Sequence, residues 1–181
     1  MKSILKTTLA LSFVAVLAAC GGGGSSSTGA GKYAGAHSYC DGDHTRFRLV
    51  LTETANGNYS LLDSEVTYQN ANCTGNVLAT YSASVPSILT FVETSVAPIR
   101  VPGLASSLSI DKYKMNAPRA TGTLTGPGVA GNCVTYPGGR FCYELNSDAL
   151  QLDLGLYPAP AGFYTLVLED GVYVGDLYAK E

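Results

Sequence analysis

The sequence predicts an all-β fold: a single antiparallel domain of about 8–10 strands, closed by two disulfides, with a barrel favoured over a sandwich. Beyond residue 31, apolar residues alternate over short runs that turn residues separate, and no helical periodicity is present. Two of the turns contain Asn-Gly or Asp-Gly, which are typical of tight hairpins. Four cysteines follow Cys20, and an even number in an exported chain indicates disulfides.

The N-terminus has the three zones of a secretory signal. Lys2 and Lys6 give a charged start, residues 7–19 are mostly apolar and carry no charge, and small residues come last. A membrane span needs about 20 apolar residues, so this stretch is too short to be one. The first 19 residues are therefore expected to be a signal peptide that is removed.

The end of this signal, Leu17-Ala18-Ala19-Cys20, resembles the lipobox of bacterial lipoproteins. The resemblance implies that Cys20 receives a diacylglycerol, that cleavage occurs before it, and that its new amine is acylated. Several acyl chains on one residue hold a protein stably on a membrane. Because Gly21 follows instead of Asp, the resemblance implies the outer membrane. A plain secretory signal, cut near Ala18 or Ala19, is the alternative.

Residues 20–31 form the expected tether between the lipid anchor and the domain, 32–181. They are mostly Gly and Ser, and a chain of this kind is a flexible coil that spans roughly 17–20 Å.

The mature chain is acidic. Without Lys2 and Lys6 it has nine basic and 14 acidic residues, so it carries a net charge of −5. No run of basic residues is present, and nucleic acid is therefore not an expected partner.

Asn56-Gly57 joins two alternating runs, 45–54 and 59–68, and predicts the first hairpin. Both residues suit a type I′ turn, which requires positive φ at its two central positions. A two-residue loop here places Phe47 opposite Val66 and Leu51 opposite Leu62. On the other face it places Arg48 opposite Glu65, a complementary pair across the two strands.

The same register brings Cys40 and Cys73 to the open end of this hairpin, which favours a disulfide between them. Cys133 and Cys142 flank a short loop centred on Pro137-Gly138, so they are expected to form the second disulfide. Each bridge is expected to stabilise the fold by roughly 2–4 kcal/mol.

Asp170-Gly171 predicts a last hairpin, from 163–169 to 172–178, with Leu168 opposite Tyr173 and Val167 opposite Val174. Both its faces are largely apolar, which indicates a central position in the sheet. The remaining expected strands are 32–39, 77–84, 89–94, 106–114, 119–125 and 149–154. Residues 85–103 and 156–162 contain prolines and are expected to form loops or edge elements.

The sequential order of these hairpins favours a barrel. The start Gly31-Lys32-Tyr33 is similar to the opening of small lipocalin-like barrels, which have a glycine, one residue and an aromatic. A barrel would offer its interior or mouth to a small apolar ligand, whereas a sandwich would offer a face or an edge to an envelope protein.

His37, Asp41, Asp43 and His44 form the densest group of polar side chains and are the weak candidates for a metal site. The alternative is a solvated turn beside the Cys40 disulfide, because Asp-Gly-Asp is ordinary turn chemistry. A lipid-anchored periplasmic hydrolase would use His37 or His44, but no Gly-x-Ser-x-Gly motif accompanies them.

Function is therefore expected to be binding or a structural role in the cell envelope, with no catalytic residue assigned and no cofactor. The sequence has no phosphate-binding loop, dinucleotide fingerprint or Cys-x-x-Cys pair. It contains twelve tyrosines and no tryptophan. Tyrosines in a pocket would bind a ligand through ring and hydroxyl, but strands are also rich in tyrosine for packing reasons alone.

Overall fold

The computed structural model describes residues 31–181, and this part of the chain is built from β-strands. The signal peptide 1–19, the lipidation site Cys20 and the tether up to residue 30 lie outside the described residues. No helix in the described part is both long and apolar enough to cross a membrane. The prediction of a single antiparallel all-β domain with two disulfides is confirmed.

Ten strands form the main sheet, in the order β2-β1-β15-β14-β13-β6-β5-β3-β4-β8. Their bounds are β1 Gly35–Cys40, β2 Thr45–Glu53, β3 Tyr59–Asn70, β4 Thr74–Ser82, β5 Ser87–Pro98, β6 Ser107–Ala117, β8 Thr123–Thr125, β13 Leu150–Ala159, β14 Gly162–Glu169 and β15 Val172–Lys180. Two small sheets contain β9 Val129–Ala130, β10 Cys133–Tyr136 and β11 Gly139–Cys142, and β7 Ala120–Thr121 with β12 Asn146–Ser147.

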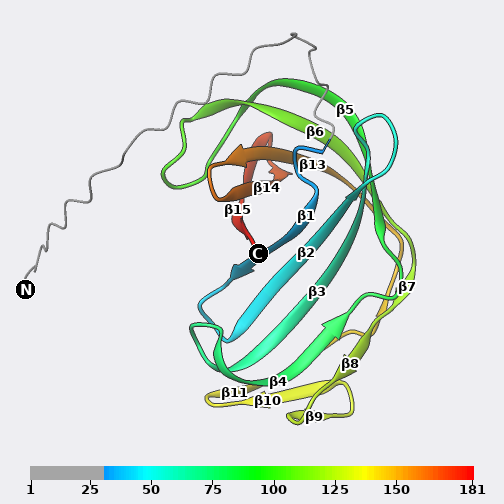
Figure 1. The fold of residues 1–181 in the computed structure, drawn as a ribbon, viewed down its shortest axis with the longest axis vertical. Helices are drawn as coiled ribbons and strands as arrows, with labels where there is room; N and C mark the ends of the chain where they lie inside the picture. The colour runs from blue at the N-terminus through cyan, green and yellow to red at the C-terminus, as the bar shows by residue number, and fades with distance from the viewer. Residues whose placement is uncertain (1–30) are drawn as a thin grey trace, which may run out of the picture.

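The main sheet curls round on itself but is not a closed barrel, so the preference for a barrel is corrected (Figure 1). β2 also pairs with β3, which brings the two sides of the sheet together. Two of the strand pairings are short. β1 pairs with β15 only through His37 and Ser38, and β3 pairs with β5 only through residues 59–61. The second half of β3 pairs with β4 instead of β5, so the sheet splits and stays open there.

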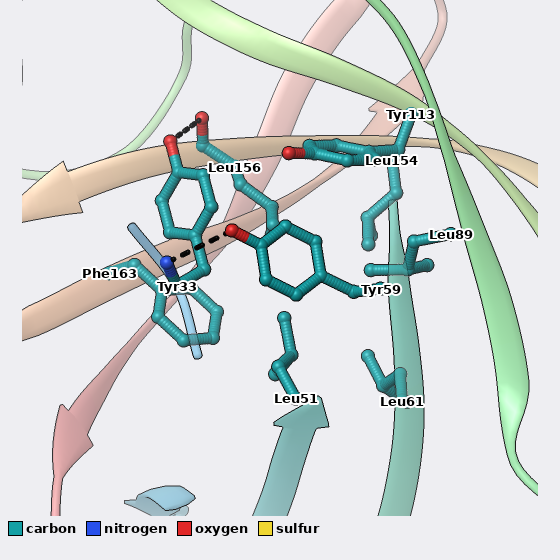
Figure 2. Packing of buried hydrophobic residues seen from close by; sticks show 9 residues of the cluster. All are labelled: Tyr33, Leu51, Tyr59, Leu61, Leu89, Tyr113, Leu154, Leu156 and Phe163. Carbon is teal, nitrogen blue, oxygen red and sulfur yellow. Dashed lines mark hydrogen bonds between the residues drawn. The ribbon is translucent and has the colours of Figure 1, made fainter. Parts of the chain in front are cut away.

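We call the concave side of this curled sheet the cup. Its closed end is filled by a core of aromatic and aliphatic side chains from six strands and from the segment before β1 (Figure 2). The core residues are Tyr33, Leu51, Tyr59, Leu61, Leu89, Tyr113, Leu154, Leu156 and Phe163. Beyond them the strands diverge towards β4, β8 and the β9–β11 sheet, and the cup widens (Figure 1).

A buried carboxylate, Asp111 on β6, ties the segment before β1 to this closed end. The Tyr33 hydroxyl donates to Asp111 at 2.6 Å and lies 3.1 Å from the Leu156 carbonyl oxygen. Lys32 forms an ion pair with the same carboxylate at 3.1 Å, and Thr94 donates to it at 2.6 Å. These hydrogen bonds, with Lys32, hold the pKa of Asp111 below its ordinary value although burial acts in the opposite direction.

The first hairpin has its predicted turn, but its register differs by one residue from the prediction. Asn56 and Gly57 both have positive φ, as a type I′ turn requires, and the Asn58 N–H donates to the Ala55 carbonyl. The Thr54 N–H also donates to the Asn58 carbonyl, so Ala55 is one extra residue on the first strand. The predicted pairing of Arg48 with Glu65 is therefore wrong.

The observed register places Leu51 opposite Leu61, Leu49 opposite Asp63 and Phe47 opposite Glu65. Because side chains alternate between the two faces, a shift of one residue moves every side chain of β3 to the opposite face. Asp63 and Glu65 consequently point into the cup instead of into solvent.

Both predicted disulfides are present. Cys40 and Cys73 join the β1–β2 turn to the β3–β4 turn, and Cys133 and Cys142 lie opposite one another on β10 and β11. The last hairpin also has its predicted register, with Leu168 opposite Tyr173. It is central, because β14 pairs with β13 on one side and β15 on the other.

The prolines led to two strands being expected too short. The strand expected at 89–94 extends over residues 87–98 as β5, and β13 continues through Pro158 to Ala159, where a loop or edge element was expected. Pro158 pairs with Phe163 of β14, whereas the ladder between β13 and β6 ends at Leu156. The missing N–H of Pro158 therefore interrupts no ladder on the β6 side.

Replacing Tyr33 with Phe tests the role of the Asp111 network. We expect the Tyr33→Phe substitution to lower the free energy of unfolding by about 1–3 kcal/mol, because it removes a hydrogen bond from a buried carboxylate. Urea denaturation of both proteins measures the change. Tyr157→Phe is the control, because the half-buried Tyr157 contacts the Tyr164 ring and its hydroxyl has no hydrogen-bond partner among the described residues. Equal losses in the two variants would contradict the proposed role of Asp111.

Candidate functional site

The wide end of the cup contains a cavity of about 360 Å³. Ligand pockets of proteins commonly have volumes of about 300–1,000 Å³. The lining residues come from strands on both sides of the cup and are mostly apolar: Leu49, Leu61, Asp63, Tyr81, Ala83, Val85, Ser87, Met115, Ala117, Pro118, Ala120, Ser147, Leu154, Thr165 and Val167. The cavity follows from the fold, since the core fills the closed end and leaves the wide end open.

Several apolar side chains that point into the cup remain accessible to solvent. Val167 on β14 is 37% exposed and Val85 in the β4–β5 turn is 38% exposed, although both line the cavity. Leu49 and Met115 are partly buried beside them. Exposed apolar side chains on a concave surface mark a place where a ligand or partner gains free energy by covering them.

Asp63 is the one charged residue among those that line this cavity. It lies on β3 opposite Leu49, and the backbone N–H of Ala83 donates to its carbonyl. In the part of the chain that the structure describes, no lysine, arginine or histidine forms an ion pair with its carboxylate. Burial without such a partner raises the pKa of the Asp63 carboxyl above its ordinary value.

Glu65 follows two residues later on the same face and lines an adjoining cavity of about 190 Å³ with Asp41, Asp43 and Phe47. Burial raises the pKa of the Glu65 carboxyl, and the negative charges of Asp63 and Asp41 raise it further, while a hydrogen bond with Tyr143 acts in the opposite direction. Burial raises the pKa of Tyr178 to about 12, and the negative charge of Asp176, with smaller contributions from Glu65 and Asp63, raises it further. Asp63 and Glu65 thus place a carboxylate in each of two cavities on the same face of β3.

The structure separates the four candidate metal ligands. His37 on β1 is buried in the cup with its ring 4.6 Å from that of Phe163, and burial lowers its pKa. His44 is buried in the β1–β2 turn, where its Nδ1 atom lies 3.0 Å from the Tyr68 carbonyl oxygen. The solvated turn that is the alternative to a metal site therefore does not include the two histidines, because both are buried.

Asp41 and Asp43 form the turn that the alternative interpretation predicted. The Asp41 carboxylate accepts hydrogen bonds from the backbone N–H groups of Asp43, at 2.7 Å, and of Thr45, at 3.2 Å. The one group of three possible metal ligands among the described residues is Cys40, Asp41 and Cys73, and its two sulfurs are bonded to each other. Neither histidine is hydrogen-bonded to a serine hydroxyl among the described residues, and no nucleophilic pair is formed there.

Sequence reasoning missed Asp63, Glu65 and Tyr81, the residues that give the cup its chemistry. The run 59–67 has apolar residues on both faces, since Tyr59 and Leu61 alternate with Leu62 and Val66. The alternation pattern is therefore satisfied by either register. The position of Ala55 in the turn decides between them, and only the paired strands show it.

Comparisons of the chain with protein-family models, with curated proteins and with solved structures found no match.

Replacing Asp63 with Asn is expected to stabilise the ligand-free protein at pH 7. A carboxyl whose pKa is raised by folding favours the folded state while it is protonated, and that contribution is lost as the pH rises through its folded pKa. At pH 7 the Asp63→Asn variant should therefore have a larger free energy of unfolding than the wild type. This difference should become smaller as the pH falls towards 4. Urea denaturation at both pH values measures it.

Asp153→Asn is the matched control for this comparison. Asp153 is on the outer face of β13 next to Leu154, where it forms an exposed ion pair with Lys114. Its substitution should change stability by no more than about 1 kcal/mol. If Asp63→Asn is destabilising at pH 7, the carboxylate has a partner and the description of the cup is wrong.

Proposed function

We propose that this protein is a cell-envelope lipoprotein that binds a small, largely apolar ligand in its cup. The cavity of about 360 Å³ carries the proposal, because apolar side chains line it and several remain exposed inside it. A cup with one closed end surrounds a small molecule on several sides, whereas a protein partner needs a broader surface. The proposed anchor is Cys20, and the proposed location is the outer membrane.

The two disulfides support a location outside the cytoplasm, since disulfides persist in oxidising compartments. A lipid anchor on Cys20 would keep the domain close to the membrane. Apolar molecules concentrate there, so the proposed ligand would meet the cup at a short distance from its source.

Filling the cavity with a larger side chain should abolish ligand binding. We expect Val167→Trp to reduce the affinity for the uncharged fluorescent probe N-phenyl-1-naphthylamine by about ten-fold or more, because the indole would occupy the space of the probe. Fluorescence titration measures the affinity. The titration uses a soluble form of the protein, residues 21–181, which includes every described residue. This form is exported with a cleavable secretory signal.

Leu168→Trp is the matched control. Leu168 neighbours Val167 on β14 and is similarly exposed, at 41% against 37%, but points to the outer face. Its substitution should leave the affinity for the probe unchanged. If the wild-type protein does not bind the probe, or if both variants bind it equally well, the ligand does not occupy the cup.

The proposed anchor predicts the N-terminus of the mature protein. Mass spectrometry of the N-terminal peptide from membranes should show that the chain begins at Cys20 and that this residue carries acyl groups. A chain that begins with an unmodified residue near Ala19 would instead indicate the plain secretory signal. That outcome would remove the lipid anchor from the proposal and leave the cup unaffected.

A further inference from the structure

The two cavities of the cup are lined by acidic residues and by no basic one. The charged residues that line its two cavities are Asp41, Asp43, Asp63 and Glu65, and no lysine or arginine is among the lining residues. Carboxylates in a concave, partly apolar site concentrate the electrostatic potential and attract cations. The cup is therefore complementary to a positively charged ligand.

The arginines nearest to these acids are turned away from them. Arg46 and Arg48 alternate with Phe47 and Leu49 on β2, so they point to the outer face. There the Arg46 guanidinium lies 5.5 Å from the centre of the Tyr68 ring, and Arg48 forms an ion pair with Glu181 at 2.7 Å. Both guanidiniums interact with groups outside the cup, and among the described residues no basic side chain forms an ion pair with Asp63.

The aromatic rings of the cup also suit a cation. Tyr81 lines the larger cavity together with Asp63, where its ring also stacks on that of Tyr143. Phe47 lines the smaller one opposite Glu65. An ammonium group close to a ring face gains about 0.5–2 kcal/mol, most where water is excluded. A cationic head near Asp63 would have a carboxylate and a ring within its reach, while an apolar tail would cover Leu154 and Val167.

We infer that the ligand of the cup is an amphipathic amine, whose ammonium head pairs with Asp63 and whose apolar tail lies on the β13–β14 side of the cavity. The inference rests on the proposed function and specifies its ligand class. A hydroxyl head would also donate to Asp63, but a hydrogen bond between two ionised groups is the stronger interaction. A carboxylate head would be repelled by Asp63 and Glu65 together.

Three probes with the same chain length test the inference: dodecylamine, dodecanol and dodecanoate, each kept below the concentration at which it aggregates. Displacement of N-phenyl-1-naphthylamine from residues 21–181 at pH 7 gives their relative affinities. We expect dodecylamine to bind about ten-fold more tightly than dodecanol, because its head forms a charge-assisted hydrogen bond, and dodecanoate to bind most weakly.

Asp63→Asn should remove the advantage of the amine over the alcohol. Its affinity for dodecanol should stay within about three-fold of the wild-type value, because the amide oxygen of Asn can still accept a hydrogen bond from the hydroxyl. Binding of dodecanol also shows that the variant is folded. Asp153→Asn makes the same change in net charge on the outer face and should keep the full preference for the amine. Equal binding of amine and alcohol by the wild-type protein would overturn the inference. An amine preference that survives in Asp63→Asn would overturn it too.

The failure of the inference differs from the failure of the proposed function. If dodecanol displaces the probe but dodecylamine has no advantage, the cup binds apolar molecules and the amine inference alone is wrong. If the wild-type protein binds neither the probe nor any of the three chains, the proposed function fails and the inference fails with it.

Discussion

The register between β2 and β3 determines the chemistry of the cup. One extra residue in the turn, Ala55, shifts the pairing so that Asp63 faces Leu49 and Glu65 faces Phe47. The period of a strand is two residues, so this single shift transfers two carboxylates from solvent to the interior. Arg48 lies on the outer face of β2 in either register, but the shift separates it from Glu65, and it forms its ion pair with Glu181 instead.

The two ends of the cup each contain a carboxylate, but its surroundings differ: Asp111 is buried, whereas Asp63 is only partly buried. At the closed end, Asp111 accepts hydrogen bonds from Tyr33, Thr94 and Lys32, and its pKa lies below the ordinary value. At the wide end no lysine, arginine or histidine of the described part of the chain forms an ion pair with Asp63, and burial holds its pKa above the ordinary value. Because an ionised group is costly to bury unless it is paired, the first arrangement stabilises the fold and the second leaves a charge for another molecule to pair.

The local signals in the sequence predicted local structure well. Asp170-Gly171 defined the last hairpin to the residue, and Cys133 and Cys142 flank the loop that their spacing indicated. A tight turn with no extra residue fixes the pairing of both its strands, so these features follow from the sequence alone. The β2–β3 hairpin has an equally clear Asn-Gly turn, but its register also depends on Ala55, for which the sequence has no signal.

Features that depend on distant strands could not be predicted. The split of the sheet arises because β3 pairs with β5 through residues 59–61 and with β4 beyond them, and the sequence of β3 has no signal for the position at which its partner changes. The cavity depends on that split. His37 and His44 illustrate the same limit, since they are seven residues apart yet one is packed on Phe163 of β14 and the other on Tyr136 of β10.

In most of the domain, inward-facing apolar side chains are covered and inward-facing charges are paired. The interior of the wide end differs on both points. Inward-facing Val167 is left exposed, and Asp63 is set among apolar side chains without a counter-charge, whereas the closed end is filled and its polar groups are almost all paired. Both departures reduce the stability of the empty protein, because apolar surface stays in contact with water and a charge is partly desolvated. One event corrects both departures, namely the entry of a molecule with an apolar body and a cationic head. Features that reduce stability are concentrated at functional sites in proteins. Here two such features, an exposed apolar side chain and a carboxylate that forms no ion pair within the described residues, occur in one cavity.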